Sequence, residues 1–196
     1  MDRTPREIIV FIGRRLSQRW TSNAAGGNMS LRVGNQIYIS PRYADYQWGW
    51  ELSPDDIVCG PIESDELLGN PSFSREGRAH LGIYRAFPEA GAIIHAHPFY
   101  VMPFCAANKA IEPILDATRM LGRVEPVPYA TPNSQELADN IVEGLRGKQD
   151  QIADFAAAVL MPKHGITLAG KDLYATFDAL VKIDMTAWSI LAQSML

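Results

Sequence analysis

Cysteine and histidine are both scarce in this 196-residue chain, which contains two of the first and four of the second. Cys59 and Cys105 lie far apart and match neither a metal-binding nor a thiol-redox spacing. We therefore expect both to be small, buried, apolar side chains. Cysteine chemistry is thus excluded as the basis of a function, and the four histidines become the residues to explain.

Other absences exclude whole classes of protein. The chain has no uninterrupted apolar run of about 20 residues, so we expect no membrane-spanning helix. It has no basic run, and 18 Lys and Arg against 22 Asp and Glu give a net charge of −4, so nucleic acid is not an expected partner. Charged residues interrupt the apolar part of the N-terminus, which argues against a secretion signal and favours a cytoplasmic protein.

The remaining pattern is that of a folded α/β protein. Hydrophobic residues make up 47% of the sequence, and the length fits one domain over residues 1–196. Thr4, Pro5 and Glu7 form a capping-box pattern, which predicts a helix that ends in the glycine-containing segment 21–28. Ser74 and Ser134 are candidate caps for helices over 75–87 and 135–145, and two further helices are expected over 99–107 and from 172 to near the C-terminus. The expected strands cover 29–33, 36–40, 56–60 and 90–98, and two more flank a turn at 162–165.

The last expected helix has two apolar stripes instead of one. A helix that is apolar on two faces is normally buried on two sides. One side is expected to face the core of the domain, and the other either meets a neighbouring subunit or is covered within the same domain. The first stripe comprises Leu173, Phe177, Leu180, Ile183, Ala187 and Ile190, and the second comprises Val181, Met185, Trp188, Ala192 and Met195.

Two of the four histidines, His95 and His97, stand one residue apart at the end of an expected buried strand. Residues i and i+2 of a strand point to the same face, so the two imidazoles should project together. A neutral imidazole is the commonest side-chain ligand of protein-bound metals. The spacing therefore favours a shared metal ion, and the competing interpretation is a hydrogen-bonded pair of core histidines.

A metal held by two histidines needs a third ligand, and the chain offers two histidine candidates. His164 lies in a turn at a strand end, where α/β proteins commonly place their sites. His80 lies within an expected helix, four residues after Glu76, so these two side chains share one helix face. Spacing alone does not choose between His80 and His164. Taken alone, Glu76 is better explained as a solvated acid in the first turn of a helix.

The glycine-containing segment 26–30 could present backbone N–H groups to an anion. Pairs of glycines before a strand are more often simple turns, so the segment alone is a weak indication of a binding site.

The chain resembles the class II aldolase/adducin family in five segments that follow the order found in the family: Gly27-Asn28-Met29-Ser30, SREGRAH around Glu76, IIHAHP, PYATPNSQELA and LMPKHGI. The resemblance covers nearly the whole chain from Gly26 onward. It implies an α/β/α sandwich around a mostly antiparallel central sheet, assembled as a homotetramer with the active site at a subunit interface. It also implies a divalent metal and a small-molecule substrate.

The resemblance assigns roles to individual residues. His95, His97 and His164 match the metal ligands of the family, which leaves His80 a structural role. Glu76 matches an acid that acts as general base or acid and can also ligate the resting metal. Tyr129 matches a tyrosine that reaches the site of a neighbouring subunit as a proton donor. Zinc is the expected metal, with Mn²⁺ or Co²⁺ as alternatives.

These roles make chemical sense for a reaction that breaks a C–C bond. A zinc ion held by three neutral imidazoles keeps an open position for substrate oxygens. As a Lewis acid it would stabilise the enediolate left by C–C cleavage. Glu76 would move the proton at the enediolate carbon, and Tyr129, whose ordinary pKa is about 10, suits the acid role at the other fragment.

The anion-binding part of the family pattern is altered here. Family members that use phosphorylated substrates carry Thr-Gly after the second strand and Ser-Ser before the glutamate, whereas this chain has Ser40-Pro41-Arg42 and Ser74-Arg75. Arg42 or Arg75 could hold a carboxylate or a phosphate as a bidentate fork. The aromatic loop 43–50 next to them either lines a pocket or packs on the core. The expected substrate- or anion-binding residues are Gly27, Asn28, Ser40, Arg42, Ser74 and Arg75.

The expected function is therefore that of a metal-dependent aldolase, a C–C lyase acting on a small hydroxy-carbonyl or sugar-phosphate-like compound. The first alternative is a decarboxylase, in which CO₂ leaves from a comparable intermediate. An epimerase is a weaker alternative, because the additional acidic and tyrosine groups it requires are not identified. The non-catalytic adducin branch is the alternative from another functional class, and the intact metal ligands argue against it.

Overall fold

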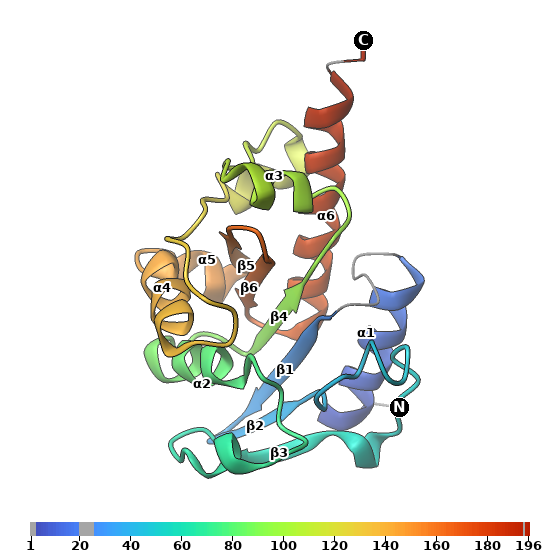
Figure 1. The fold of residues 1–196 in the computed structure, drawn as a ribbon, viewed down its shortest axis with the longest axis vertical. Coiled ribbons are helices and arrows are strands. Elements are labelled where there is room, and N and C mark those ends of the chain that lie inside the picture. Colours follow the sequence, from blue (N-terminus) through green and yellow to red (C-terminus); the bar gives the residue numbers. More distant parts are fainter. Residues whose placement is uncertain (1–2, 20–25, 194) are drawn as a thin grey trace.

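The computed structural model describes residues 3–19, 26–193 and 195–196 and contains one six-stranded sheet (Figure 1). The strand order is β3-β2-β1-β4-β6-β5, and every neighbouring pair of strands is antiparallel. The strands are β1 (Asn28–Val33), β2 (Gln36–Ile39), β3 (Val58–Pro61), β4 (Ala92–Ala96), β5 (Ala156–Met161) and β6 (Gly165–Gly170).

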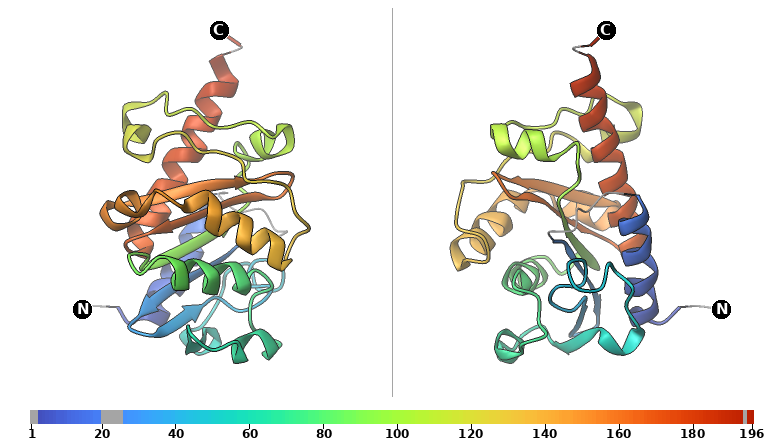
Figure 2. Two further views of the ribbon diagram at one scale, coloured as in Figure 1. Left: turned by 90° about the vertical axis from the view of Figure 1, so that its left-hand side faces the viewer. Right: turned by 45° about the vertical axis from the view of Figure 1, so that its right-hand side comes forward.

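Helices cover both faces of the sheet, and each face has its own hydrophobic core (Figure 2). On one side lie α1 (Pro5–Gln18) and α6 (Leu173–Gln193), with the short α3 (Met102–Ala107) near the end of α6. On the other side lie α2 (Gly77–Ala86), α4 (Gln135–Leu145) and α5 (Gln149–Asp154). Consecutive strand residues alternate between the two cores, as the pleat requires. The α/β/α sandwich with an antiparallel sheet is thus confirmed.

The first helix begins as predicted. The Thr4 hydroxyl accepts from the Glu7 backbone N–H, the Glu7 carboxylate accepts from the Thr4 backbone N–H, and Pro5 occupies the first helical position. The helix ends at Gln18, with Arg19 as its C-cap. The rest of its predicted end, from residue 20 to 25, lies outside the described residues.

Several local features differ from the sequence predictions, among them α3, which begins at Met102 instead of Phe99. Helix α2 begins at Gly77, two residues later than expected, because the Ser74 hydroxyl accepts from the Glu76 N–H and holds Arg75 and Glu76 in a turn. Helix α5 was not predicted, because its six residues are too few to show a helical period. Three short 3₁₀ helices were also not predicted: Pro54–Asp56, Glu66–Gly69 and Asp116–Leu121.

The two stripes of α6 have different environments. Leu173, Leu180 and Ala187 from the first stripe are fully buried against the sheet. In the second stripe, Met185 is 45% and Trp188 43% exposed, so this stripe is not covered within the domain. The alternative of a helix sandwiched inside one domain is therefore wrong for the described structure. No helix in the described residues is both long enough and apolar enough to cross a membrane.

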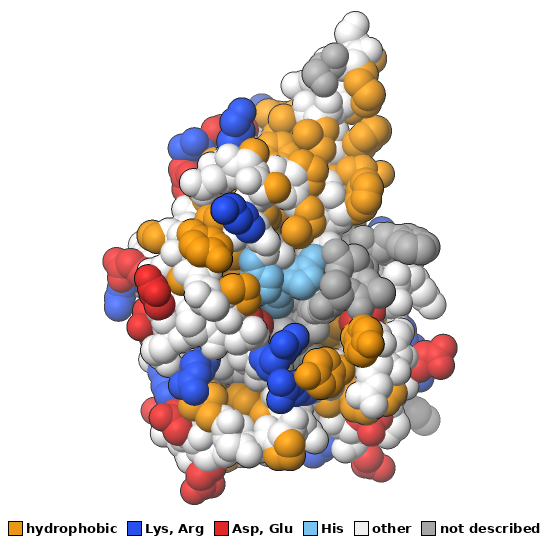
Figure 3. Space-filling model, in the orientation of Figure 1, with side chains coloured by type: hydrophobic (Ala, Val, Ile, Leu, Met, Phe, Trp, Pro, Cys, Tyr) orange, Lys and Arg blue, Asp and Glu red, His pale blue; other side chains and the backbone are white. Residues whose placement is uncertain are grey.

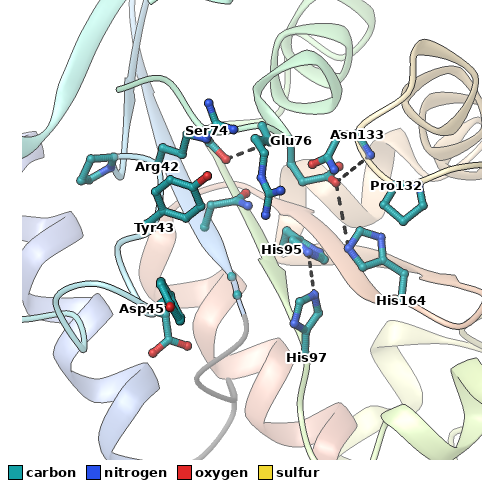
Figure 4. A pocket seen from close by; sticks show the side chains of 16 residues that line it. Arg42, Tyr43, Asp45, Ser74, Glu76, His95, His97, Pro132, Asn133 and His164 are labelled. Carbon is teal, nitrogen blue, oxygen red and sulfur yellow. Dashed lines mark hydrogen bonds and ion pairs between the residues drawn. The ribbon is translucent and has the colours of Figure 1, made fainter. Parts of the chain in front are cut away.

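The sheet brings three chain segments to one edge. The register pairs Asn28 of β1 with His95 of β4, and His95 with Thr167 of β6. Because neighbouring strands run in opposite directions, the first residue of β1, the last residues of β4 and the beginning of β6 meet at this edge. The segment that enters α2 reaches the same place (Figures 1 and 4).

A partly buried carboxylate holds the segment that follows β4. Asp184 of α6 accepts from the Tyr100 backbone N–H at 3.1 Å, three residues after His97. Burial raises the pKa of Asp184 to about 6, and the backbone N–H groups of Tyr100 and Val101 oppose this shift. This hydrogen bond ties the chain to α6 shortly after it leaves β4.

We predict that Asp184 makes the stability of the protein depend on pH. Its pKa is higher in the folded than in the unfolded chain, so the folded state binds more protons between about pH 4 and about pH 6. The free energy of unfolding, relative to that of Asp184→Asn, should therefore fall as pH rises through this range. Asn keeps an acceptor for the Tyr100 N–H without the charge. Urea unfolding of both proteins at several pH values measures the difference, and parallel curves would contradict the prediction.

Candidate metal centre

Three histidines converge at the sheet edge, as Figure 4 shows. His95 lies on β4, His97 follows β4 directly, and His164 lies in the turn that leads into β6. Nε2 of His95 and Nε2 of His97 are 3.0 Å apart, and one ligand atom from each of the three histidines lies within 4.8 Å of the other two. The prediction that His95 and His97 project together is confirmed, and His164 joins them.

The hydrogen bonds of the cluster leave lone pairs directed at its centre. Nδ1 of His95 donates to the Ile166 carbonyl at 3.1 Å, because a carbonyl oxygen can only accept. The proton of neutral His95 is therefore on Nδ1, and the lone pair of its Nε2 points toward Nε2 of His97, 3.0 Å away. Nδ1 of His164 is buried and has no hydrogen-bond partner. Metal-binding histidines typically have one ring nitrogen oriented by a hydrogen bond, as in His95, and a second nitrogen left without a protein partner, as in His164. The residues fit a divalent metal.

Burial keeps the three imidazoles neutral. It lowers the pKa of His97 to about 4, and the neighbouring His164 lowers it further. The pKa of His95 falls well below the usual range through burial and through both other histidines, and the pKa of His164 falls through burial and the nearby Arg75. Metals bind the neutral form of histidine. The cluster is therefore in its metal-binding form at neutral pH.

A buried carboxylate stands beside the histidines. Glu76 occupies the N-cap position of α2 and is only 7% exposed. Its Oε1 lies 4.0 Å from Nε2 of His164 and accepts from the Asn133 backbone N–H at 3.2 Å. Burial raises the pKa of Glu76, while the Asn133 bond and then the charge of Arg75 lower it. The explanation of Glu76 as a solvated first-turn acid is therefore wrong.

His80 lies away from the cluster. It is fully buried, and both ring nitrogens are engaged, Nδ1 with the Ser30 hydroxyl and Nε2 with the Asn28 side chain. Among the described residues, the His, Cys, Asp and Glu side chains close enough to share a metal are His95, His97 and His164. Geometry thus makes the choice between His80 and His164 that spacing left open.

The histidines open into a cavity of about 250 Å³. Figure 3 shows them in a hollow with basic side chains beside them. Five of the six predicted substrate- or anion-binding residues line this cavity: Gly27, Asn28, Arg42, Ser74 and Arg75.

Two predicted residues do not line the cavity within one chain. Ser40 is fully buried, and its hydroxyl accepts from the Met29 backbone N–H at 3.1 Å, so it joins β1 to β2 and takes no part in an anion site. Tyr129 is 58% exposed and lies outside the cavity lining, with the Lys163 ammonium over its ring. A tyrosine so exposed is available to another chain.

The aromatic loop divides between the two predicted environments. Tyr43 and Tyr46 line the cavity, whereas Trp50 is fully buried in the core. Sequence reasoning missed the other lining residues: Asp45, Pro132 and Asn133. Asn133 adopts φ +65°, a left-handed conformation that Asn tolerates better than most residues, and the Pro-Asn-Ser sequence was the available signal for this turn.

The fold and this site together define the class of protein. The family model of the class II aldolase and adducin N-terminal domain matches residues 7–190. The chain therefore belongs to the class II aldolase/adducin family.

Individual relatives agree with this assignment. The chain is 28% identical over 194 residues to a 3-oxo-tetronate 4-phosphate decarboxylase of Haemophilus influenzae, covering 95% of this chain and 86% of that protein. It is 29% identical over 165 residues to an L-fuculose phosphate aldolase of Methanococcus maripaludis, covering 84% and 83%. Its fold matches the structure of an L-fuculose 1-phosphate aldolase with a TM-score of 0.82 at 24% identity, covering 100% of this chain and 89% of that one.

Close packing of the cluster depends on Gly165. A Cβ at this position would lie 2.5 Å from the Ala96 carbonyl oxygen and 2.6 Å from Cδ2 of His97. Both distances are well below van der Waals contact. The absence of a side chain here lets β6 approach His95 and His97.

We predict that Gly165→Ala destabilises the protein by about 1–3 kcal/mol, since an added methyl group in a packed site forces its neighbours apart. Gly69→Ala is the matched control, because a Cβ at Gly69 meets no atom within 4 Å. Chemical denaturation of both variants measures the effect. Equal stabilities of the two variants would show that the edge can relax around an added methyl group.

Proposed function

We propose that this protein is a divalent-metal-dependent lyase that breaks a C–C bond next to a carbonyl, and that its reaction is aldol cleavage of a small hydroxy-carbonyl compound. The observation that carries the proposal is the convergence of three neutral imidazoles and one buried carboxylate on a cavity. Membership of the family supports it, and so do the aldolase and decarboxylase names of the relatives, since both reactions are C–C cleavages.

In this proposal His95, His97 and His164 hold the metal, with Zn²⁺ as the first choice and Mn²⁺ or Co²⁺ as alternatives. A set of three imidazole nitrogens with an open position favours Zn²⁺. When bound, the cation would supply Lewis acidity to the carbonyl oxygen beside the breaking bond. Glu76 is proposed as an additional ligand before substrate enters, because it stands beside the cluster with its Oε1 4.0 Å from Nε2 of His164.

Glu76 carries the proton transfer in this proposal. In aldol cleavage the hydroxyl of the departing aldehyde loses its proton, the C–C electron pair passes to the carbonyl-bearing fragment, and that fragment takes up a proton at carbon. Glu76 delivers this last proton. Its carboxylate has one fixed neighbour, the Asn133 N–H, and little exposure to solvent, so it can exchange a proton with a substrate carbon without competing with bulk water.

Two arginines are proposed to hold the anionic end of the substrate. The guanidinium groups of Arg42 and Arg75 lie 5.0 and 5.5 Å from the ring centroid of Tyr43, and neither makes an ion pair with a described residue. Backbone donors are scarce nearby, because Pro41 has no N–H and the Arg42 N–H is bonded to the Ser72 carbonyl. The two arginine side chains would therefore bind the anion in place of backbone N–H groups. A phosphate or a carboxylate would suit them. Gly27, Asn28 and Ser74 complete this end of the cavity.

The site is proposed to be completed by a second subunit in a homotetramer. The exposed stripe of α6, with Met185 and Trp188, offers an apolar surface for such an assembly. Tyr129 is exposed and lies outside the cavity of its own chain, so it would enter the cavity of a neighbour. There it would take up the proton that the substrate hydroxyl loses in cleavage, and return it to the aldehyde oxygen in the reverse direction.

Decarboxylation is the second candidate, and a specific observation favours it. The relative from Haemophilus influenzae, which matches 95% of this chain, is named as a decarboxylase. In a 3-oxo acid the bond that breaks is again next to a carbonyl, and CO₂ takes the place of the departing aldehyde. The same metal and the same proton donor would serve, while Tyr129 would have no aldehyde oxygen to protonate.

We predict that His95→Ala loses the metal and keeps the fold. The variant removes one of three ligands, so its affinity for the metal should fall and most chains should hold no ion. Metal analysis of protein never exposed to chelator should give about one divalent ion per wild-type chain and far less in the variant, with unchanged circular dichroism. Wild-type protein without metal would refute the enzyme proposal and favour the non-catalytic branch. A variant unfolded at ambient temperature would identify His95 as structural.

The reaction itself is tested by a substrate screen. Phosphorylated and non-phosphorylated aldols and 3-oxo acids are incubated with metal-loaded protein, with chelated protein and with His95→Ala. Metal-dependent release of an aldehyde identifies an aldolase, and release of CO₂ identifies a decarboxylase. Turnover that survives in the chelated protein would contradict the proposed role of the metal.

We predict that Tyr129→Phe keeps its metal but lowers kcat about 10²- to 10⁴-fold in aldol cleavage, as removal of a group that transfers a proton does. If Tyr129 serves a neighbouring chain, co-expression with His95→Ala should form mixed oligomers in which some sites have both wild-type residues. Those oligomers should regain activity that neither variant has alone. If the mixture regains no activity, Tyr129 either acts in its own chain or takes no part in the reaction.

A further inference from the structure

A buried row of four polar side chains runs from the core to the cavity. Nε2 of His80 lies 2.6 Å from Oδ1 of Asn28, and Nδ1 of His80 lies 2.7 Å from the Ser30 hydroxyl. The Ser30 hydroxyl in turn lies 2.9 Å from the Tyr84 hydroxyl. Asn28 and Ser30 are i and i+2 on β1, while His80 and Tyr84 are i and i+4 on α2. The row is therefore formed where one strand face packs against one helix face.

The direction of every hydrogen bond in this row follows from its chemistry. A side-chain amide oxygen only accepts, so Nε2 of His80 donates to Asn28. Burial lowers the pKa of His80 to about 3, so the ring is neutral and has one N–H. Nδ1 must then accept from Ser30, and the oxygen of Ser30 accepts from Tyr84. In every hydrogen bond of the row, the donor is therefore on the Tyr84 side and the acceptor on the Asn28 side.

This order fixes which end of the Asn28 amide faces the cavity. With Oδ1 held by His80, the amide nitrogen Nδ2 has no hydrogen-bond partner among the described residues. Asn28 lines the cavity and is the strand neighbour of His95. Its NH₂ group is thus an available donor next to the metal centre.

We propose that His80 is a positioning residue, which holds the Asn28 amide with its N–H donors toward the cavity so that they bind a substrate oxyanion. The inference rests on the proposed anion-binding role of Asn28 and adds the residue that gives this amide its orientation. The row explains why His80 is histidine: of the neutral side chains, imidazole carries a donor and an acceptor on opposite sides of one rigid ring.

The opposite proton order would have the opposite effect. If Nδ1 of His80 carried the proton, Nε2 would accept from the Asn28 NH₂ group, and the amide oxygen would face the cavity. A carbonyl oxygen there would repel an anion. The tautomer therefore separates these two orders. A purely space-filling role for His80 would be indifferent to the order, and phosphate binding tests it.

The first test is the tautomer of His80 in metal-loaded wild-type protein. Two-bond ¹⁵N–¹H correlation spectra at pH 7 distinguish a ring protonated at Nε2 from one protonated at Nδ1. We expect the Nε2–H form of His80. The Nδ1–H form, or rapid exchange between the two, would overturn the proposal.

The second test measures inorganic phosphate binding to the metal-loaded protein by calorimetry. His80→Gln keeps an N–H donor near the position of Nε2, whereas His80→Leu removes it, and both lose the imidazole ring. We expect the Kd of phosphate to rise about tenfold in His80→Leu and to stay within about threefold in His80→Gln, since one hydrogen bond to a charged group is at stake. Equal Kd values in the two variants would overturn the proposal.

Asn28→Asp, which keeps the shape and has no N–H donor, should weaken phosphate binding at least as much as His80→Leu. Acetate in place of phosphate shows whether a carboxylate uses the same donor. Wild-type protein that binds neither anion would refute the role of Asn28. Because neither readout requires turnover, a negative substrate screen leaves this inference standing, and an altered tautomer leaves the proposed lyase standing.

Discussion

The site depends on the close approach of three uncharged histidines at one edge of the sheet. Three protonated imidazoles would repel each other at this separation, and burial prevents protonation by removing the water that would solvate the charge. The approach itself requires the antiparallel pairing of β4 with β6 and the bare backbone of Gly165. The sandwich provides both, because helices on its two faces exclude water from the strands that carry the cluster.

The cavity combines acidic and basic groups around the cluster. A buried carboxylate, Glu76, stands beside the histidines, and its pKa is raised by the same burial that lowers theirs. Arg42 and Arg75 lie near Tyr43 without an ion pair among the described residues, and the charge of Arg75 also lowers the pKa values of Glu76 and His164. Asn28 lines the same cavity, and its orientation is set from the core. A substrate with both a carbonyl and an anionic group fits this set of side chains.

Much of the fold could be predicted from local signals, and the misses have local causes. The capping box at Thr4 and the cap at Ser134 specify helix starts, since their hydrogen bonds lie within one turn. The start of α2 was misplaced because Ser74 forms a turn with Glu76 instead of a helix cap. Ser40 was predicted in the site by its place in the sequence, whereas the pleat of β2 turns its hydroxyl inward to Met29.

The sequence by itself determined the pairing of two histidines, because the two-residue period of a strand puts His95 and His97 on one face whatever surrounds them. Family resemblance extended this to His164 and Glu76. Only the tertiary structure decided how these groups work together, because that depends on contacts between segments far apart in the chain. Strand order brought His164 to the pair, burial gave Glu76 its altered pKa, and packing of α2 on β1 enclosed His80 with Asn28. Such contacts depend on how the strands pair and how the helices pack on the sheet, and no local sequence pattern specifies either.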